Sequence, residues 1–221
     1  MSPEQHAKVL PTPAASNHSA KRTRIMATRI LALALSILLT ACGGGGSEIP
    51  VSTESPSGPV QIAAFGDSTQ AFHGNPHTSS RDGWTIENKG VSGSSTSEWY
   101  SRWPAEMAAT KASIVIYNGG LNDGGMSVDQ YRATLREMIR ITRAFGKQFV
   151  LEQPNNADAS GDIVLPTFIE RRAAVALVAS SEGVYYCAQP DVPLRDGIHP
   201  TDAGYATKAV RLAACIEGIL K

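Results

Sequence analysis

The feature that most constrains the fold is an alternation, from residue 59 onward, of short apolar runs with longer amphipathic stretches. The short runs predict β-strands, and the amphipathic stretches between them predict helices. Strands that alternate with helices in this way pair in parallel, with helices on both faces of the sheet. We therefore expect an α/β fold with a five-stranded parallel sheet, whose strands lie at 61–65, 85–88, 113–117, 148–151 and 184–186.

The clearest helix signal begins at Ser127, whose hydroxyl can cap the first turn while Gln130 reaches back to it. This helix should end near Gly146 and bury one side, made of Val128, Tyr131, Leu135, Met138, Ile139 and Thr142. Other helices are expected at 97–108, at 166–181 and after Thr201. The last of these should bury Tyr205, Ala209, Leu212 and Ile216.

The N-terminal region has the pattern of an export signal. An apolar run at 30–39 follows four basic residues and is too short to span a membrane. It ends in Leu39-Thr40-Ala41-Cys42, which resembles the lipobox of bacterial lipoproteins, so Cys42 is the expected lipidation site. An ordinary signal peptide in which Cys42 is incidental is the alternative. Met26 could be the true start, since it would open a signal of normal length.

These signals divide the chain into a signal peptide and leader at 1–41, a Gly/Ser/Pro-rich tether at 42–59 and a folded domain at 60–221. The expected location is the bacterial cell envelope, with a lipid at Cys42 as the only membrane contact. Beyond the leader, the chain has 15 Lys or Arg and 19 Asp or Glu, a net charge of −4. This charge argues against a nucleic-acid partner, and we expect a monomer.

Four polar motifs follow predicted strands: Gly66-Asp67-Ser68, then 88–93, which ends in Gly93, then 120–123, which contains Asn122, then Asp196-Gly197-Ile198-His199. In an open α/β sheet, ligands bind outside the carboxyl ends of the strands. We therefore expect all four motifs to meet at that edge. Each motif alone could be a simple turn or loop, and it is their conjunction and order that indicate a site.

In these motifs and their order, the region from about Val60 to the C-terminus resembles the SGNH hydrolases, the GDSL esterase and lipase family. The resemblance implies a flavodoxin-like three-layer α/β/α sandwich. It also implies a catalytic triad of Ser68, Asp196 and His199, and an oxyanion hole formed by Ser68, Gly93 and Asn122. No metal or organic cofactor is implied. Where the family often has a leucine after the serine, this chain has Thr69-Gln70, so the pocket wall should differ.

The residue types suit this chemistry. A serine hydroxyl is a weak nucleophile unless a base removes its proton, and His199 can act as that base. Asp196 can accept from the other imidazole nitrogen, which fixes the tautomer and stabilises the imidazolium. The backbone N–H groups of Ser68 and Gly93 and the amide of Asn122 can donate to the developing oxyanion.

Two residue pairs leave alternatives open. In an exported protein, Cys187 and Cys215 can form a disulfide that ties the last helix to the sheet edge, although two buried free thiols are an equally valid interpretation. His73 and His77 are four residues apart, but Pro76 between them disfavours the helix that would align them as metal ligands. We expect them at the rim of the pocket or elsewhere on the surface, with no metal site.

The tryptophans and one asparagine pair also have two interpretations. Trp84, Trp99 and Trp103 could line a sugar-binding surface or pack in the core. Asn155 and Asn156 follow a predicted strand and could border the pocket.

The function predicted from these observations is that of an exported serine esterase that works through an acyl-enzyme. Only 6% of residues are aromatic and no long apolar lid is evident, which favours small acyl groups, such as acetyl on a carbohydrate. The alternatives are a lipase or thioesterase of the same family, a non-catalytic glycan-binding lipoprotein with the same fold, and an envelope protein held by its lipid alone.

Overall fold

The structure is a computed structural model, and it describes residues 59–72, 82–161, 163 and 165–221. The expected signal peptide, Cys42, the tether up to residue 58, His73 and His77 lie outside the described residues, so the expectations for them remain predictions. In the described part of the chain, no helix combines the length and the apolar character that crossing a bilayer requires.

One parallel sheet forms the centre of the fold, with the strand order β2-β1-β3-β4-β5. The predicted α/β fold with five parallel strands is confirmed. β1 lies between β2 and β3, so the chain adds β2 on one side of β1 and then crosses to add β3 on the other side. Open α/β sheets bind ligands at the carboxyl ends of the strands where this reversal occurs, which here is the carboxyl end of β1. The strands are β1 Val60–Gly66, β2 Trp84–Asn88, β3 Ile114–Asn118, β4 Gln148–Glu152 and β5 Tyr185–Cys187.

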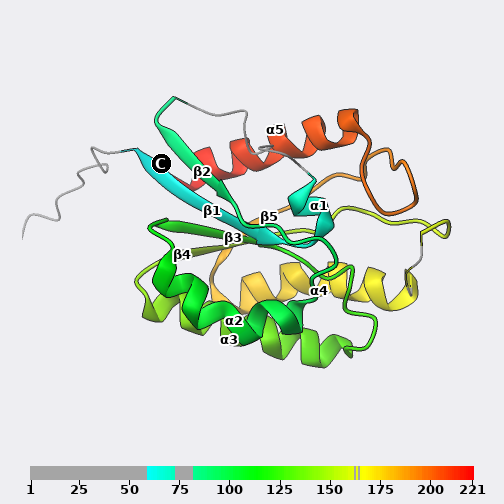
Figure 1. The fold of residues 1–221 in the computed structure, drawn as a ribbon, viewed down its shortest axis with the longest axis horizontal. Helices are drawn as coiled ribbons and strands as arrows, with labels where there is room; N and C mark the ends of the chain where they lie inside the picture. The colour runs from blue at the N-terminus through cyan, green and yellow to red at the C-terminus, as the bar shows by residue number, and fades with distance from the viewer. Residues whose placement is uncertain (1–58, 73–81, 162, 164) are drawn as a thin grey trace, which may run out of the picture. The chain divides into compact units, whose positions relative to one another are not determined.

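The helices cover the two faces of the sheet unequally. Figure 1 shows α5 on one side and α2, α3 and α4 on the other. The predicted starts at Ser127 and Thr201 are the N-caps of α3 and α5, and Ser127 and Gln130 form the expected capping box. The helices are α1 Ser68–Ala71, α2 Thr96–Ala109, α3 Val128–Ala144, α4 Leu165–Glu182 and α5 Asp202–Ile219.

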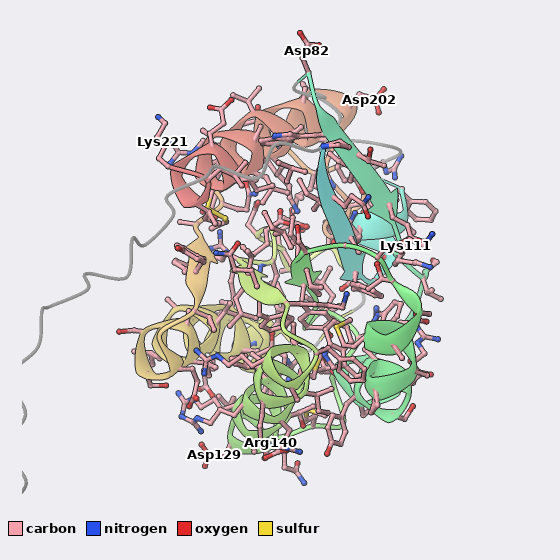
Figure 2. The ribbon with its side chains drawn as sticks, turned by 90° about the vertical axis from the view of Figure 1, so that its left-hand side faces the viewer. Asp82, Lys111, Asp129, Arg140, Asp202 and Lys221 are labelled. Carbon is pink, nitrogen blue, oxygen red and sulfur yellow. A yellow bond between two sulfur atoms is a disulfide. The ribbon has the colours of Figure 1, made fainter. Side chains whose placement is uncertain are left out.

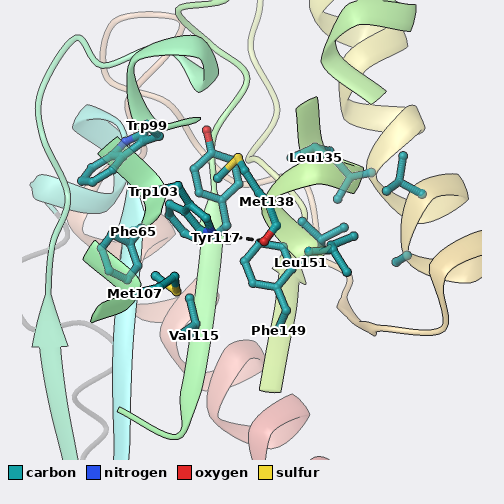
Figure 3. Packing of buried hydrophobic residues seen from close by; sticks show 14 of the residues in the cluster. Phe65, Trp99, Trp103, Met107, Val115, Tyr117, Leu135, Met138, Phe149 and Leu151 are labelled. Carbon is teal, nitrogen blue, oxygen red and sulfur yellow. Dashed lines mark hydrogen bonds between the residues drawn. The ribbon is translucent and has the colours of Figure 1, made fainter. Parts of the chain in front are cut away.

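The face under α2, α3 and α4 holds the larger core, which is rich in aromatic rings (Figure 3). Trp103 is fully buried in it, and its ring lies edge-on to the rings of Phe65, Tyr117 and Phe149, with centroid separations of 4.9, 5.8 and 5.8 Å. Edge-to-face contacts of this kind add to the stabilisation that burial provides. This core is therefore the main apolar anchor of the sheet.

The structure separates the two interpretations of the tryptophans. Trp99 and Trp103 are buried in the larger core, so they are packing residues and a sugar-binding surface on them is excluded. Trp84 is half-buried and packs against the smaller core on the opposite face. The indole N–H groups of both buried tryptophans donate to the backbone, Trp99 to Gly66 at 3.0 Å and Trp103 to Met138 at 3.1 Å.

The face under α5 holds a smaller, aliphatic core in which residues of β1, β3 and β4 meet Leu212 and Ile216. A disulfide joins Cys187 at the end of β5 to Cys215 in α5, and it is visible as a yellow bond beside α5 in Figure 2. Of the two interpretations of these cysteines, the structure thus contains the bridged one. The bridge attaches the last helix to the edge strand of the sheet.

Candidate active site

The turn that carries Ser68 is built by its neighbours. Strand β1 ends at Gly66, where an added Cβ would lie 2.1 Å from the carbonyl oxygen of Asn118, so only glycine fits. Asp67 is the N-cap of α1, and its Oδ1 accepts from the backbone N–H of Thr69 at 2.9 Å and from the Thr69 hydroxyl at 2.8 Å. Ser68 therefore begins α1, where no earlier helical carbonyl can take its backbone N–H.

The histidine motif reaches the serine from the loop between β5 and α5. His199 Nε2 lies 2.8 Å from Ser68 Oγ, and His199 Nδ1 lies 2.7 Å from Asp196 Oδ2. The other carboxylate oxygen of Asp196 accepts the backbone N–H groups of Ile198 and His199, at 3.1 and 2.7 Å. Gly197 takes a φ of 79°, which allows the short loop to fold back on itself.

The electrostatics of the loop assign the protons. The backbone hydrogen bond from His199, with further hydrogen bonds to the carboxylate, lowers the pKa of Asp196 to about 2. An ionised carboxylate can only accept, so Nδ1 of a neutral His199 must carry the proton. Nε2 is then an acceptor that faces the Ser68 hydroxyl, which is the arrangement that a general base needs.

The two other predicted oxyanion donors come from separate loops that touch each other. Asn122 Nδ2 donates to the backbone oxygen of Ser94, next to Gly93, at 3.1 Å, and the second hydrogen of that amide leaves a donor for a ligand. Gly93 has a φ of 78° and an added Cβ would meet no described atom within 4 Å, so its conformation, rather than crowding by the protein, requires glycine. The backbone N–H of Val91 donates to Gly66 at 3.0 Å, which joins this loop to the serine turn.

Several residues that hold the site were not predicted. Asp123 is buried and accepts from the backbone N–H of Thr96 at 2.8 Å and from its hydroxyl at 2.5 Å. This pair joins the Asn122 loop to the start of α2, and the hydroxyl of Tyr117 donates to Thr96 at 2.9 Å. Burial raises the pKa of Asp123, and the hydrogen bonds from Thr96 partly oppose that effect.

The asparagine pair expected at the pocket border supports the histidine loop. Asn155 is fully buried, and its Nδ2 donates to the backbone oxygen of Ile198 at 2.8 Å. Asn156 exchanges two hydrogen bonds with the backbone of Val192, at 2.8 and 3.1 Å. Both side chains therefore hold the segment that leads into His199.

Described side chains border the site on two sides. The exposed ring of Phe72 lies edge-on to the His199 ring, with centroids 5.3 Å apart, and the guanidinium of Arg195 lies 5.7 Å from the Phe72 ring. On the side of Asn122, a cavity of about 490 Å³ is bordered mostly by polar side chains, including Ser97 and Gln130.

A cluster of buried charges lies at the carboxyl edge, outside the triad. It contains Asp67, Glu152 at the end of β4, and Lys208 of α5, each about 1% exposed. Burial raises the pKa of both carboxyl groups and lowers the pKa of Lys208, while attraction between the opposite charges counteracts each shift. Within the described residues, no group of three His, Cys, Asp or Glu side chains is arranged to hold a metal ion.

A doubly wound parallel sheet that carries a Ser-His-Asp arrangement at its carboxyl edge is typical of hydrolases that act on acyl groups. The chain belongs to the GDSL-like Lipase/Acylhydrolase family, which it matches over residues 62–207. Membership of this family implies an ester-hydrolysing activity. Comparison with curated protein sequences found no match.

Solved structures show the same fold at low sequence identity. A lipase/acylhydrolase from Enterococcus faecalis matches with a TM-score of 0.63 and 20% sequence identity, and the match covers 73% of this chain and 97% of the chain of that protein. A carbohydrate acetylesterase from Sinorhizobium meliloti has a TM-score of 0.61 and 15% identity, covering 72% and 99%. A variant of an acetyl-xylooligosaccharide esterase from Geobacillus has a TM-score of 0.57 and 19% identity, covering 74% and 94%.

Proposed function

We propose that this protein is an exported serine esterase that removes small acyl groups, such as acetyl, from carbohydrates or related substrates. The observation that carries the proposal is the continuous hydrogen-bonded line from Ser68 Oγ through the His199 ring to Asp196, with contacts of 2.8 and 2.7 Å. Three groups in this order form the arrangement that activates a serine in acyl transfer.

The reaction proceeds in two halves. Ser68 Oγ attacks the ester carbonyl carbon as its proton moves to His199 Nε2, and the oxyanion is held by donors on Ser68, Gly93 and Asn122. The intermediate collapses, the alcohol leaves with the proton from His199, and an acyl-enzyme remains on Ser68. Water then gives a proton to His199 and attacks the acyl carbon. The second intermediate collapses as His199 returns that proton to Ser68 Oγ, which releases the carboxylic acid and restores the serine.

The choice of substrate is supported by the surroundings of Asn122. The cavity there is lined by hydroxyl and amide side chains of Ser95, Ser97, Gln130 and Thr134, with Met126 as its largest apolar wall residue. Such a lining suits a small acyl group or a hydroxylated alcohol better than a long alkyl chain. The acetylesterases among the structural neighbours support the same choice.

The proposed location follows from the N-terminal sequence alone. Cleavage before Cys42 and lipidation of that residue would attach the domain to a bacterial membrane through the tether at 42–59. Mass spectrometry of the N-terminal peptide from membranes tests this part independently, because an unmodified Cys42 would contradict it.

The first prediction concerns the nucleophile. The parent protein should hydrolyse short-chain p-nitrophenyl esters, and Ser68→Ala should lower kcat by roughly 10⁴-fold or more, because the acyl-enzyme cannot form. A fluorophosphonate probe should label Ser68 in the parent. Equal hydrolysis by parent and variant would defeat the proposal, and glycan affinity without labelling would indicate a binding protein instead.

Esters of increasing chain length, measured beside acetylated xylan, separate acetylesterase from lipase or thioesterase activity.

A further inference from the structure

Lys208 is a buried cation that the proposed reaction does not use. It lies in α5 with its side chain about 1% exposed, and its Nζ is 3.8 Å from Glu152 Oε1, whose side chain is fully buried. Burying an ion pair removes both charges from water, and apolar residues of similar volume are often as stable or more so. Fold stability alone therefore gives little reason for a lysine at this position.

The surroundings of Lys208 connect it to the histidine loop. Its Nζ donates to Asn155 Oδ1 at 3.4 Å, so the Nδ2 side of the same amide faces the loop and donates to the oxygen of Ile198 at 2.8 Å. That oxygen belongs to the peptide group between Ile198 and His199. The N–H of this peptide group donates to Asp196 at 2.7 Å, so both of its polar atoms are held. The backbone from which the His199 ring projects is thus fixed on two sides.

The same cation also acts on the serine turn. Lys208 attracts the carboxylate of Asp67, the residue that precedes Ser68 and caps α1. Asp67 is buried, and its Oδ2 has no hydrogen-bond partner in the part of the chain that the structure describes. An uncompensated carboxylate oxygen at such a place is costly. The attraction of Lys208 reduces that cost only in part, since burial still raises the pKa of Asp67, and it leaves Oδ1 to hold Thr69.

We propose that Lys208 is a positioning residue that holds His199 in its orientation toward Ser68, through its hydrogen bond to Asn155. The proposal rests on the function proposed above. It adds that a side chain outside the triad and the oxyanion hole controls the rate of the chemical step. The structure contains the required arrangement because α5 places Lys208 against Asn155, whose amide holds the histidine loop.

The test uses three variants of the full-length protein. Lys208→Met removes the charge at similar length, and the double variant Lys208→Met with Glu152→Gln also removes the carboxylate that would be left unpaired. Asn155→Asp leaves Lys208 and Glu152 unchanged in sequence but replaces the donor to Ile198 with an acceptor. Lys147→Met is the matched control, because Lys147 donates to the backbone oxygens of Thr110 and Ala112, at 2.8 and 2.9 Å, away from the site.

The expected result is a loss of kcat that is independent of the change in thermal midpoint. Lys208→Met and Asn155→Asp should each lower kcat by about 10- to 100-fold with little change in KM, because small displacements of reacting groups are costly in rate. The double variant should regain the thermal midpoint that Lys208→Met loses but keep its low kcat. Lys147→Met should lower the thermal midpoint and leave kcat unchanged.

Three outcomes would overturn the proposal. They are a parental kcat in Lys208→Met, recovery of kcat together with the thermal midpoint in the double variant, and failure of all three variants to fold, which would make the cluster purely structural. Ser68→Ala measured in parallel separates the two proposals. If it is as active as the parent, the proposed function is wrong; if it is inactive while the Lys208 and Asn155 variants are fully active, only the positioning role is wrong.

Discussion

The two faces of the sheet are covered by different kinds of side chain. Under α2, α3 and α4 lies a core of packed aromatic rings, whereas the α5 side combines a smaller aliphatic core with a disulfide and, near the carboxyl edge, Glu152 and Lys208. Alternation along β4 explains the division, since Phe149 and Leu151 face the aromatic core while Val150 faces α5. Glu152, two residues after Val150, falls on the α5 side.

The difference indicates that the two faces of the sheet have different roles. The aromatic face holds the larger cluster of buried apolar residues, so it should dominate the free energy of unfolding. The α5 face accepts buried charges beside the loops that carry Ser68 and His199, which costs stability but orders the site. The disulfide on the α5 face compensates for this loss of stability, because it links α5 covalently to the end of β5. Substitutions on the two faces should therefore separate stability from rate.

The largest effect on stability is expected at Trp103. Trp103→Ala removes the ring that contacts three other aromatic side chains, and it should lower the free energy of unfolding by about 3 to 5 kcal/mol. Its activity per folded molecule should stay close to that of the parent. Denaturant unfolding and active-site titration measure the two quantities. Tyr100→Ala, at a 39% exposed position in the same helix, is the control, and equal losses in both variants would contradict the assignment of the main core.

The disulfide should have the next largest effect. Replacing Cys187 and Cys215 by alanine opens a link between residues 28 apart in sequence, which should lower the free energy of unfolding by roughly 3 kcal/mol. The parent in reductant should unfold like the double variant. If the parent and the double variant have the same denaturant midpoint under oxidising conditions, the bridge does not contribute to the stability of the α5 face.

Much of the fold could be predicted because one local signal encodes it. Strands alternate with helices whose apolar residues recur at helical spacing, so the strand positions and the caps at Ser127 and Thr201 could be located directly. The candidate site could be assembled because its motifs follow strands, whose carboxyl ends share one edge. Both steps use information that lies within a few neighbouring residues.

The supporting residues were missed for a different reason. The bond from Asn155 to Ile198 joins loops 43 residues apart, and no periodic pattern relates such segments. Lys208 did carry a signal, because it lies three residues after Tyr205 and four before Leu212, on the stripe of α5 that is buried. A lysine on such a stripe indicates a buried partner, but the sequence does not reveal that the partner is Glu152.

The smallest expected effect concerns the exposed end of the triad. Asp196 is 49% exposed, and hydrogen bonds hold its pKa at about 2, below the ordinary 3.8. As the pH falls, the unfolded chain therefore takes up the proton first, so the stabilisation from ionised Asp196 is complete above about pH 5 and is lost as the pH falls toward 2. Thermal midpoints of the parent and of Asp196→Asn should differ slightly at neutral pH and converge in acid. A difference in thermal midpoint between parent and variant that stays constant down to about pH 2 would contradict the lowered pKa. Because Asp196 stays ionised above about pH 4, a decline of kcat/KM with acid above that pH must come from another group.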